Sequence, residues 1–407
     1  MIDANTIKSL LKGVDVEWKN VTDIFNIKNG YTPSKTNPEF WTNGDIPWFR
    51  MEDIRENGRI LNNSLQKINK IAIKGGKLFP ANSIIISTTA TIGEHALITV
   101  PYLSNQQLTN FSLKNEFKKI LNIKFIYYYF FIFSENAKKI VNISSLPSVQ
   151  MTELKKWNFP IPSLDVQNKI VNILDTFTAL TTELTTELNA RLKQYNYYRD
   201  KLLSFAEDEV EWKTLDEVGI LIRGNGLQKK DFTEQGMPAI HYGQIYTFYK
   251  TFADQTKSYV SFDLAKKLRR AKYGDILIAG TSENIEDVMK PLGWFGGDIV
   301  ISGDMFTFRP NEKVDTKYLT YLLQTSNFKQ FKTKYAQGTK VIRVKSENFL
   351  KYVIPIPPLS KQKQIVEILD KFDTLANSIA EGLPREIELR QKQYEYYRNL
   401  LLDFPKS

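Results

Sequence analysis

Apolar residues recur at intervals of three and four along two long stretches of the chain. The first stripe runs from Ile170 to Leu202 and the second from Ile365 to Leu401, with polar residues between the apolar positions. This spacing is typical of a helix that packs on another helix. At 1.5 Å per residue, roughly 40 residues make a helix roughly 60 Å long. Two such helices in one chain can cover each other's apolar stripe, so the pattern predicts an antiparallel coiled-coil strut.

The remaining segments combine short strands, turns and shorter helices. Residues 83–87 and 275–279 are short apolar runs of the kind found in buried strands. Residues 121–142 and 316–335 are long enough for helices. Clusters such as Gly224-Asn225-Gly226 indicate turns. Because strands and helices do not alternate regularly, we predict an α+β fold and not a doubly wound sheet.

Prolines precede both stripes and predict the domain boundaries. Pro160 and Pro162 stand before the first stripe, and Pro355, Pro357 and Pro358 before the second. Proline interrupts regular structure, so each mixed domain should end there. We therefore predict four parts: a mixed domain with an N-terminal helix at 1–162, a helix at 163–205, a second mixed domain at 206–357 and a second helix at 358–407.

The chain also repeats itself once. The tetrapeptide at 16–19, Val-Glu-Trp-Lys, recurs at 210–213, and Pro-Ile-Pro at 160–162 recurs at 355–357. The motif Gln-Tyr-x-Tyr-Tyr-Arg closes both copies, at 194–199 and 393–398. An offset near 195 residues is far longer than a solenoid repeat. Each copy is therefore a domain followed by its helix.

The middle of each copy has diverged. Residues 29–35 face residues 223–229, and only a glycine and the final lysine persist. Arg50 aligns with His241 in a second such segment. Backbone-setting residues that agree while projecting side chains differ favour two similar scaffolds that recognise different targets. Simple drift after the duplication is the alternative.

Smaller irregularities mark both helices. Thr-Thr-Glu-Leu at 181–184 is repeated at 185–188. The second helix carries four more residues between matched points, at Glu381-Gly382-Leu383-Pro384. An insertion of four residues is close to one helical turn. The glycine and proline there should kink or break the helix.

Composition excludes several kinds of site and points to a polyanionic partner. The 407 residues include no cysteine and two histidines, so thiolate metal sites and cysteine nucleophiles are excluded and no metal site is expected. The net charge is +10. Residues 1–162 carry a net +7 and residues 206–357 a net +3, whereas residues 163–205 are neutral and residues 358–404 carry −1. Positive charge on the domains predicts that the domains hold nucleic acid while the helices act as struts.

Motifs for catalysis and targeting are missing. The sequence contains no P-loop, no dinucleotide fingerprint and no Gly-x-Ser-x-Gly. It has no Pro-Pro-Tyr or Pro-Pro-Phe tripeptide either. We expect no catalytic residue and no cofactor bound by this chain. The N-terminus lacks a signal peptide and the longest apolar run is too short to span a bilayer, so we expect a cytoplasmic protein.

Taken together, these motifs resemble the specificity subunit of type I restriction–modification systems, HsdS. The resemblance covers nearly the whole chain. It rests on the two diverged domains, the Pro-Ile-Pro segments with Gln167 and Asp175 or Gln362 and Asp370, and the Gln-Tyr-x-Tyr-Tyr-Arg endings. Pro384 departs from the pattern because it interrupts the second helix.

The resemblance implies a subunit that makes and breaks no covalent bond. Each target-recognition domain would read one half of a split double-stranded DNA site. The helices would set the distance between the halves and dock methyltransferase subunits, two in number, with restriction or translocase subunits as further partners. Tetrapeptide repeats such as the one at 181–188 would act as spacer rulers. S-adenosylmethionine would be bound by the methyltransferase.

DNA contacts require Lys or Arg for phosphates, and Arg, Asn, Gln, Ser or Thr for base edges. We select residues of these kinds, with nearby aromatic side chains, in turn-rich loops and at strand ends. In the first domain they are Asn29, Tyr31, Lys35, Trp48, Arg50, Thr88, Thr89 and Thr91. In the second domain they are Arg223, Asn225, Gln228, Lys229, His241, Gln244, Lys340 and Arg343. A solvated surface position, or a core position for Trp48, is the alternative.

The tyrosines near each helix end cover more than one helix face. Two per copy can pack inward, and we predict that Tyr197 and Tyr396 face outward with Arg199 and Arg398 as a partner-docking patch. Packing within the strut is the alternative. For the chain as a whole, other functions remain open: a structural coiled-coil protein that binds nucleic acid without sequence preference, a decoy that binds the methyltransferase, and a nuclease with an unrecognised carboxylate site.

Overall fold

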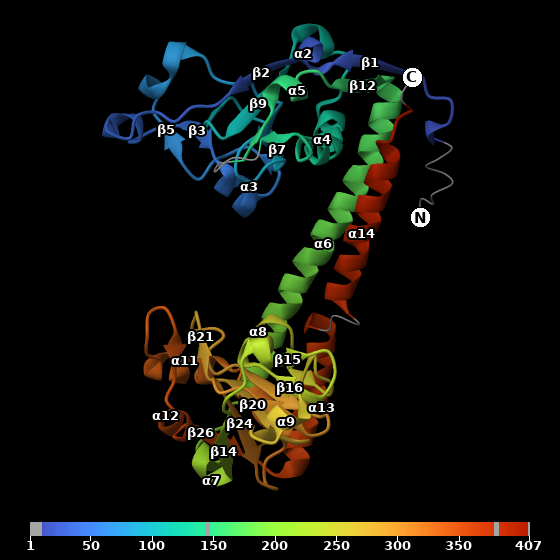
Figure 1. Ribbon diagram of the computed structural model, residues 1–407. Helices are drawn as coiled ribbons and strands as arrows, with labels where there is room; N and C mark the ends of the chain where they lie inside the picture. Colours follow the sequence, from blue (N-terminus) through green and yellow to red (C-terminus); the bar gives the residue numbers. More distant parts are fainter. Residues whose placement is uncertain (1–9, 143–146, 378–381, 406–407) are drawn as a thin grey trace. The chain divides into compact units, whose positions relative to one another are not determined.

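The computed structural model describes residues 10–142, 147–377 and 382–405 (Figure 1). The chain divides into two compact units: Met1–Thr181 with Arg390–Ser407, and Thr182–Leu389. Each unit holds one mixed domain together with helical segments from both halves of the chain. The predicted N-terminal helix falls mostly on residues 1–9, outside the described residues.

The first unit is built on a five-stranded sheet with the order β2-β9-β6-β7-β4. Neighbours are antiparallel except β4 and β7, which are parallel. The strands are β2 (Phe25–Asn29), β4 (Ile60–Leu61), β6 (Ser83–Ser87), β7 (His95–Ile98) and β9 (Leu108–Leu113). Helix α4 (Ile123–Ala137) packs on this sheet through Phe125 and Phe130, which are fully buried with Ile84 and Phe111.

A smaller sheet and several short elements complete the first domain. Strand β3 (Ile46–Phe49) lies between β5 (Lys67–Ile68) and β8 (Leu103–Ser104). The other elements are α2 (Val21–Ile24), α3 (Met51–Asn57), α5 (Met151–Leu154), η1 (Pro38–Phe40), η2 (Lys70–Ala72), η3 (Lys74–Gly76), η4 (Asn115–Phe117), β10 (Val141–Asn142) and β11 (Ser148–Val149).

The second unit repeats this plan. Its main sheet has the order β14-β24-β20-β22-β17, which matches the first sheet strand for strand. The strands are β14 (Gly219–Arg223), β17 (Phe252–Ala253), β20 (Ile276–Ala279), β22 (Pro291–Trp294) and β24 (Met305–Pro310). The second sheet is larger, with the order β15-β18-β16-β23-β19. Both copies therefore share one architecture, as the duplicated sequence motifs predict.

The remaining elements of the second domain are short. The strands are β15 (Phe232–Thr233), β16 (Met237–Ile240), β18 (Ser258–Val260), β19 (Arg270–Ala271), β21 (Thr281–Ser282), β23 (Ile299–Ile301) and β25 (Ile342–Arg343). The helices are α7 (Leu215–Val218), η5 (Lys229–Asp231), α8 (Tyr242–Thr247), α9 (Phe262–Ala265), α10 (Thr316–Leu322), α11 (Ser326–Tyr335) and α12 (Ser346–Leu350).

The repeated motifs at the domain boundaries form one antiparallel strand pair in each unit. In the first unit, β1 (Val16–Asn20) pairs with β12 (Asn158–Pro162), and Trp18 lies opposite Pro160. In the second, β13 (Glu211–Thr214) pairs with β26 (Val353–Ile356), and Trp212 lies opposite Pro355. This pair closes each domain at the point where its long helix begins.

The first stripe forms one unbroken helix, α6 (Leu164–Leu202), of 39 residues. The second forms two, α13 (Leu359–Asn377) and α14 (Leu383–Leu401). Gly382 separates them with a left-handed backbone φ of 83°. A side chain there would lie 2.6 Å from the Thr374 carbonyl oxygen, so glycine is required. The predicted break is confirmed, although Glu381 itself lies outside the described residues.

Each domain core is completed by a helix end that comes from the other copy. Leu401, Leu402 and Phe404 are buried in the core of the first domain, and the Phe404 ring lies 6.0 Å from Phe125. Tyr195 and Leu203 are buried in the core of the second domain. Within the first unit Phe177 of α6 packs on Tyr397 of α14, and within the second Tyr198 packs on Phe372 of α13. Helix-on-helix packing is thus confirmed in each unit.

The predicted short elements are found with shifted bounds. Residues 83–87 form β6, and β20 begins one residue later than expected. The helix predicted at 121–142 is the shorter α4, and the one predicted at 316–335 is divided into α10 and α11. Within the described residues, each helix is too short or too polar to cross a membrane.

Candidate nucleic-acid interface

A glycine marks the same close approach in both domains. A side chain on Gly30 would lie 2.2 Å from the Ser104 carbonyl oxygen, and one on Gly224 would lie 1.9 Å from the Ser302 carbonyl oxygen. A residue with a side chain at either position would collide with the neighbouring backbone. This explains why the glycine persists between two otherwise diverged loops, and it places both predicted recognition loops at equivalent positions.

In the first domain, the side chains of Asn29, Thr109 and Thr88 are connected by hydrogen bonds at the end of the main sheet. The Thr109 hydroxyl donates to Asn29 Oδ1 at 2.8 Å, and it lies 3.0 Å from the Thr88 hydroxyl. Thr89 follows Thr88 in the chain, and its backbone forms an isolated antiparallel β-bridge with Ser148. Thr89 and Thr91 have buried hydroxyl oxygens without a hydrogen-bond partner in the described structure. Asn29 is exposed at the strand end, so this edge presents its amide group, while the hydroxyl groups of the threonines behind it are buried.

In the second domain, a cleft of about 250 Å³ gathers the predicted Arg223 and Arg343. Arg223 ends β14, and Arg343 ends β25, which pairs with β21. Ile342 packs on the core while Arg343 is exposed, as alternation along a strand requires. The cleft is lined by Arg223, Gly280, Thr281, Gly303, Asp304, Phe306, Arg343, Val344, Lys345, Ser346 and Glu347.

Arg50 and His241, which align in the sequence, occupy the same structural position. Each precedes an equivalent helix, α3 or α8, and each backbone N–H donates to a side chain three residues later: Asp53 at 2.7 Å and Gln244 at 2.9 Å. Gln244 also donates to Ser258, so its amide is engaged. Burial, then Lys229, lowers the pKa of His241, while Asp304 opposes the shift. Burial thus favours the neutral form of His241.

Two predicted aromatic residues support the first recognition loop. Trp48 is 3% exposed, packs edge-on against Trp41 and donates to the Tyr31 carbonyl oxygen at 3.0 Å. Its ring belongs to the core and is not presented to a base. The Tyr31 hydroxyl accepts from the Lys74 backbone N–H at 2.8 Å, and the Lys74 ammonium lies 5.1 Å from the ring.

Each recognition loop is bound to an exposed basic segment that the sequence analysis did not select. Tyr31 holds the segment with Lys70, Lys74 and Lys77. In the second domain, Asn225 donates to the Lys267 carbonyl oxygen and accepts from the Arg269 N–H. The second segment carries Lys266, Lys267, Arg269 and Arg270, all exposed. A run of four cations in five residues is visible in the sequence and could have been selected as a phosphate-binding patch.

The other predicted residues lie around these loops. Lys35, Gln228 and Lys229 are exposed. Lys340 is exposed in a loop that is closed by mutual backbone hydrogen bonds between Gln337 and Arg343. Gln106, Gln107 and Asp304, which lie close to Ser104 or Ser302 in the sequence, were not selected from the sequence. Gln106 is exposed and accepts from the Thr32 hydroxyl at 2.6 Å.

The family model for the type I restriction modification DNA specificity domain matches this chain twice, at residues 13–194 and 207–389. The chain belongs to the type I specificity family. The chain is 43% identical over 400 residues to the type I restriction enzyme EcoprrI specificity subunit of Escherichia coli, covering 94% of this chain and 93% of that protein. It is 32% identical over 439 residues to a putative type I specificity subunit of Haemophilus influenzae, covering 98% of each.

Solved structures agree on the fold of the type I specificity family. A chain from a study of complex assembly and conformational transition of the type I R-M system matches with a TM-score of 0.64 at 13% identity, covering 96% of this chain and 98% of that one. The S subunit from M. genitalium matches with a TM-score of 0.50 at 17% identity, covering 97% and 98%. The family model and the relative at 43% identity make the chain a type I specificity subunit, which is not the catalytic part of such systems. The predicted alternative of a structural protein without sequence preference finds no support in these comparisons.

The family motif residues Gln167 and Gln362 attach each long helix to its domain. Both side chains are fully buried. Gln167 Oε1 accepts from the Asn122 N–H at 2.8 Å, and its amide nitrogen donates to the Ile120 and Pro162 carbonyl oxygens. The same three bonds connect Gln362 to the Asp315 N–H and to the Lys313 and Pro357 carbonyl oxygens.

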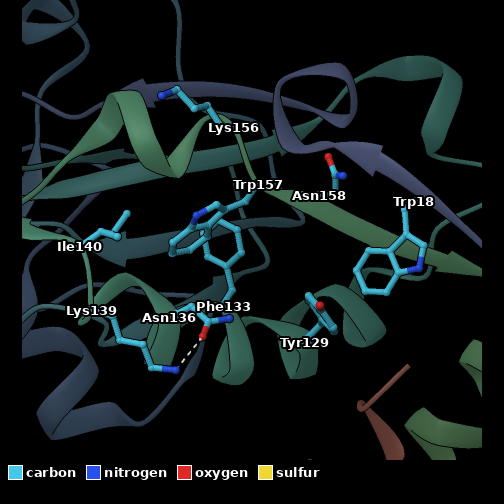
Figure 2. A pocket seen from close by; sticks show the side chains of 9 residues that line it. All are labelled: Trp18, Tyr129, Phe133, Asn136, Lys139, Ile140, Lys156, Trp157 and Asn158. Atoms are coloured by element: carbon cyan, nitrogen blue, oxygen red, sulfur yellow. Dashed lines mark hydrogen bonds between the residues drawn. The ribbon is translucent and has the colours of Figure 1, made fainter. Parts of the chain in front are cut away.

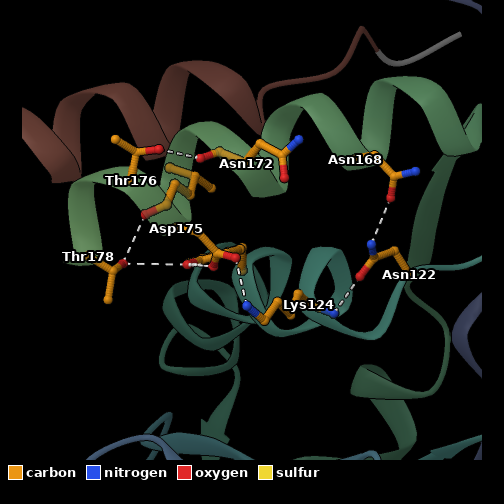
Figure 3. A network of polar contacts seen from close by, with 9 residues as sticks. Asn122, Lys124, Asn168, Asn172, Asp175, Thr176 and Thr178 are labelled. Atoms are coloured by element: carbon orange, nitrogen blue, oxygen red, sulfur yellow. Dashed lines mark hydrogen bonds and ion pairs between the residues drawn. The ribbon is translucent and has the colours of Figure 1, made fainter.

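The second motif residue, an aspartate two turns later, adds an ion pair and a tyrosine in each copy. Asp175 lies 2.6 Å from Lys124 Nζ and accepts from the Tyr128 hydroxyl at 2.7 Å. Asp370 binds Lys317 and Tyr321 at the same two distances. Figure 3 shows the first of these networks, with Asn122 also reaching Asn168 on α6. The specificity family's motif therefore fixes the angle between helix and domain.

Tyr197 and Tyr396 face outward as predicted, but Tyr198 is also 36% exposed, and the arginines do not accompany the exposed pair. Tyr197 is 60% exposed and Tyr396 is 57% exposed. Arg199 is 8% exposed and binds Asp200. The Arg398 guanidinium lies 4.3 Å over the Phe131 ring. Both arginines therefore make their contacts within their own units, Arg199 with Asp200 and Arg398 with Phe131.

A further cavity in the first domain, of about 570 Å³, lies away from the predicted DNA contacts (Figure 2). Aromatic side chains line much of it, and Lys139 and Lys156 stand at its edge. The lining residues are Trp18, Tyr129, Phe133, Asn136, Lys139, Ile140, Lys156, Trp157 and Asn158. Among the described residues, no cluster of three or more His, Asp or Glu side chains could hold a metal ion.

Proposed function

We propose that the two domains read the two halves of a split double-stranded DNA site. The observation that carries this proposal is the equivalence of the two recognition edges. Gly30 and Gly224 hold the loops at matched positions, yet Asn29 stands where the other copy has Arg223, and Arg50 stands where it has His241. Matched backbones with different hydrogen-bonding side chains fit two readers of different base sequences.

The basic segments supply phosphate contacts that do not depend on the DNA sequence. Lys70, Lys74 and Lys77 in the first domain and residues 266–270 in the second are exposed beside the recognition loops. Cations there can neutralise phosphates and fix the register of each domain on the duplex, while the strand-end residues meet base edges. The division between positioning and reading contacts follows that of other DNA-binding proteins.

Selection of bound duplexes from a random-sequence pool tests this function. The chain is used in complex with its methyltransferase subunits, which would bind S-adenosylmethionine. We expect enrichment of two short fixed blocks separated by a gap of constant length. Enrichment of a single block, or retention that follows the salt concentration and not the sequence, would contradict the proposal.

The helices are proposed to set the gap between the two blocks. The repeated Thr-Thr-Glu-Leu at 181–188 lies inside α6. Four residues correspond to about 6 Å of helix, and one base pair rises about 3.4 Å along the duplex. The repeat is therefore of the right size to change the gap by whole base pairs.

Deleting Thr185–Leu188 is expected to shorten the gap by about one to two base pairs while both half-sites stay the same. The measurement is the selected motif of the deleted chain compared with that of the intact chain. Replacing the same four residues by alanines, which keeps the helix length, serves as the control and should leave the gap unchanged. A changed half-site after the deletion would refute the ruler.

The exposed Tyr197 and Tyr396 are proposed to dock two methyltransferase subunits, one near each helix end. Large exposed aromatic side chains are the residues that most often anchor protein interfaces. Tyr197→Ala and Tyr396→Ala should each weaken binding of one methyltransferase subunit by about tenfold or more. Native mass spectrometry measures the number bound. Tyr273→Ala, which removes another exposed tyrosine, is the control; equal loss in all three variants would exclude a docking role.

A further inference from the structure

The cleft of the second domain presents hydrogen-bonding groups that the protein itself leaves unused. The side chains of Arg223, Arg343, Asp304 and Glu347 take part in no hydrogen bond or ion pair within the described residues. Arg223, Arg343 and Glu347 are exposed and Asp304 is half-buried, so all four side chains around this space of about 250 Å³ are open to a ligand. The cleft is therefore provided with free donors and free acceptors.

The backbone around the cleft is rigid, so these side chains project from fixed positions. Arg343 is held by two backbone hydrogen bonds to Gln337, each 2.9 Å long, and its strand pairs with Thr281. Arg223 ends a strand whose five residues all pair with β24. Asp304 follows Gly303, whose backbone lies against the Asn225-Gly226 turn. Selective recognition requires polar side chains that are held in place by a rigid backbone.

The chemistry of the free groups matches one base pair. Guanine presents two acceptors, N7 and O6, in the major groove, and arginine binds both together. Its partner cytosine presents the N4 amino donor, which a carboxylate accepts. A·T pairs do not offer two adjacent acceptors on one base.

We propose that the cleft lined by Arg223, Arg343, Asp304 and Glu347 recognises a G·C pair within the half-site of the second domain. An arginine binds guanine N7 and O6, and a carboxylate accepts from cytosine N4. This inference rests on the proposed function and adds the identity of a base pair. The first domain has Asn29, Thr88 and Thr89 at the corresponding edge and no arginine there, so the assignment concerns the second half-site alone.

Substitution of single guanines by 7-deazaguanine, which lacks the N7 acceptor, tests the contact. The full chain in complex with its methyltransferase subunits is titrated with duplexes that carry its selected site. At one guanine of one half-site, the replacement should weaken binding by about 5- to 150-fold. In the variant that removes the reading arginine, Arg343→Lys or Arg223→Lys, the same replacement should have little further effect, because the two losses share one contact.

Lysine keeps the charge but cannot form the paired bonds, which separates base reading from phosphate binding. Arg191→Lys, a half-exposed arginine of α6 that takes no part in the proposed DNA contacts, is the control and should bind the selected site almost as well as the unchanged chain. If both cleft variants also bind like the unchanged chain, or if 7-deazaguanine weakens every variant equally, the inference is overturned while the split-site function stands. If the unchanged chain selects no split site, the proposed function itself fails.

Discussion

Acidification from pH 6.5 to pH 5 is expected to lower the free energy of unfolding of the first domain by about 2 kcal/mol through His95 alone. His95 is completely buried between β7 and α4. Its Nε2 lies 3.2 Å from the Tyr127 carbonyl oxygen and its Nδ1 lies 3.0 Å from the Ser134 hydroxyl. The ring therefore donates to the carbonyl and accepts from the hydroxyl, as only neutral histidine can.

Burial, and next the Arg59 guanidinium, lowers the pKa of His95 from its ordinary value of 6.5 to about 3. The unfolded chain binds a proton below pH 6.5, whereas the folded chain does not until about pH 3. The stabilising contribution is therefore fully present above pH 6.5 and is lost as the pH falls toward 3, at about 1.4 kcal/mol per pH unit.

Two measurements check this. The sequence has only two histidines, so their ring protons are easily assigned, and the His95 signal should not titrate between pH 8 and pH 5. Urea unfolding of the full chain should show a smaller dependence on pH in His95→Gln, whose amide can still donate to Tyr127. A His95 signal that titrates near pH 6.5 would show that the ring is not buried as described.

Replacing Gln362 by leucine is expected to destabilise the second domain by about 3 kcal/mol. The substitution removes three hydrogen bonds, to the Asp315 N–H and to the carbonyl oxygens of Lys313 and Pro357, and each such group that is left without a partner away from water costs about 1–3 kcal/mol. Gln167→Leu should act alike on the first domain, because its three bonds are equivalent. Partial relaxation of the backbone keeps the total below the sum of the individual costs.

Unfolding of each full-length variant in urea measures this effect. Gln364→Leu is the matched control, since Gln364 is exposed two residues later on the same helix, and it should change the free energy of unfolding by less than about 0.5 kcal/mol. If Gln362→Leu and Gln364→Leu unfold alike, the conserved glutamine does not attach the helix to the domain.

Local patterns in the sequence predict the helices and the duplication well. The stripe from Ile170 to Leu202 forms α6 as expected, because an apolar stripe that long has few other ways to be buried. Gly382 interrupts the second helix for a local reason, its left-handed backbone. The Pro-Ile-Pro segments form matching strands in the two units.

Features that depend on distant contacts were not predictable. Two of the three partners of Gln167, Asn122 and Ile120, lie more than 40 residues away in sequence, and no local pattern indicates that they meet it. Trp48 illustrates the same limit, since only the fold places it beneath Tyr31. The loops with Gln106 and Asp304 were missed because the offset between the copies changes there, from 194 at Gly30 to 198 at Ser104.

The central claim is that this chain alone determines which split DNA sequence its complex recognises. The most direct measurement is methylome sequencing of cells that express the methyltransferase subunits with and without this chain. The account predicts one methylated motif, with two fixed blocks and a constant gap, that appears only when the chain is present. Methylation that is unchanged by the chain, in cells where the methyltransferase is active, would contradict the account.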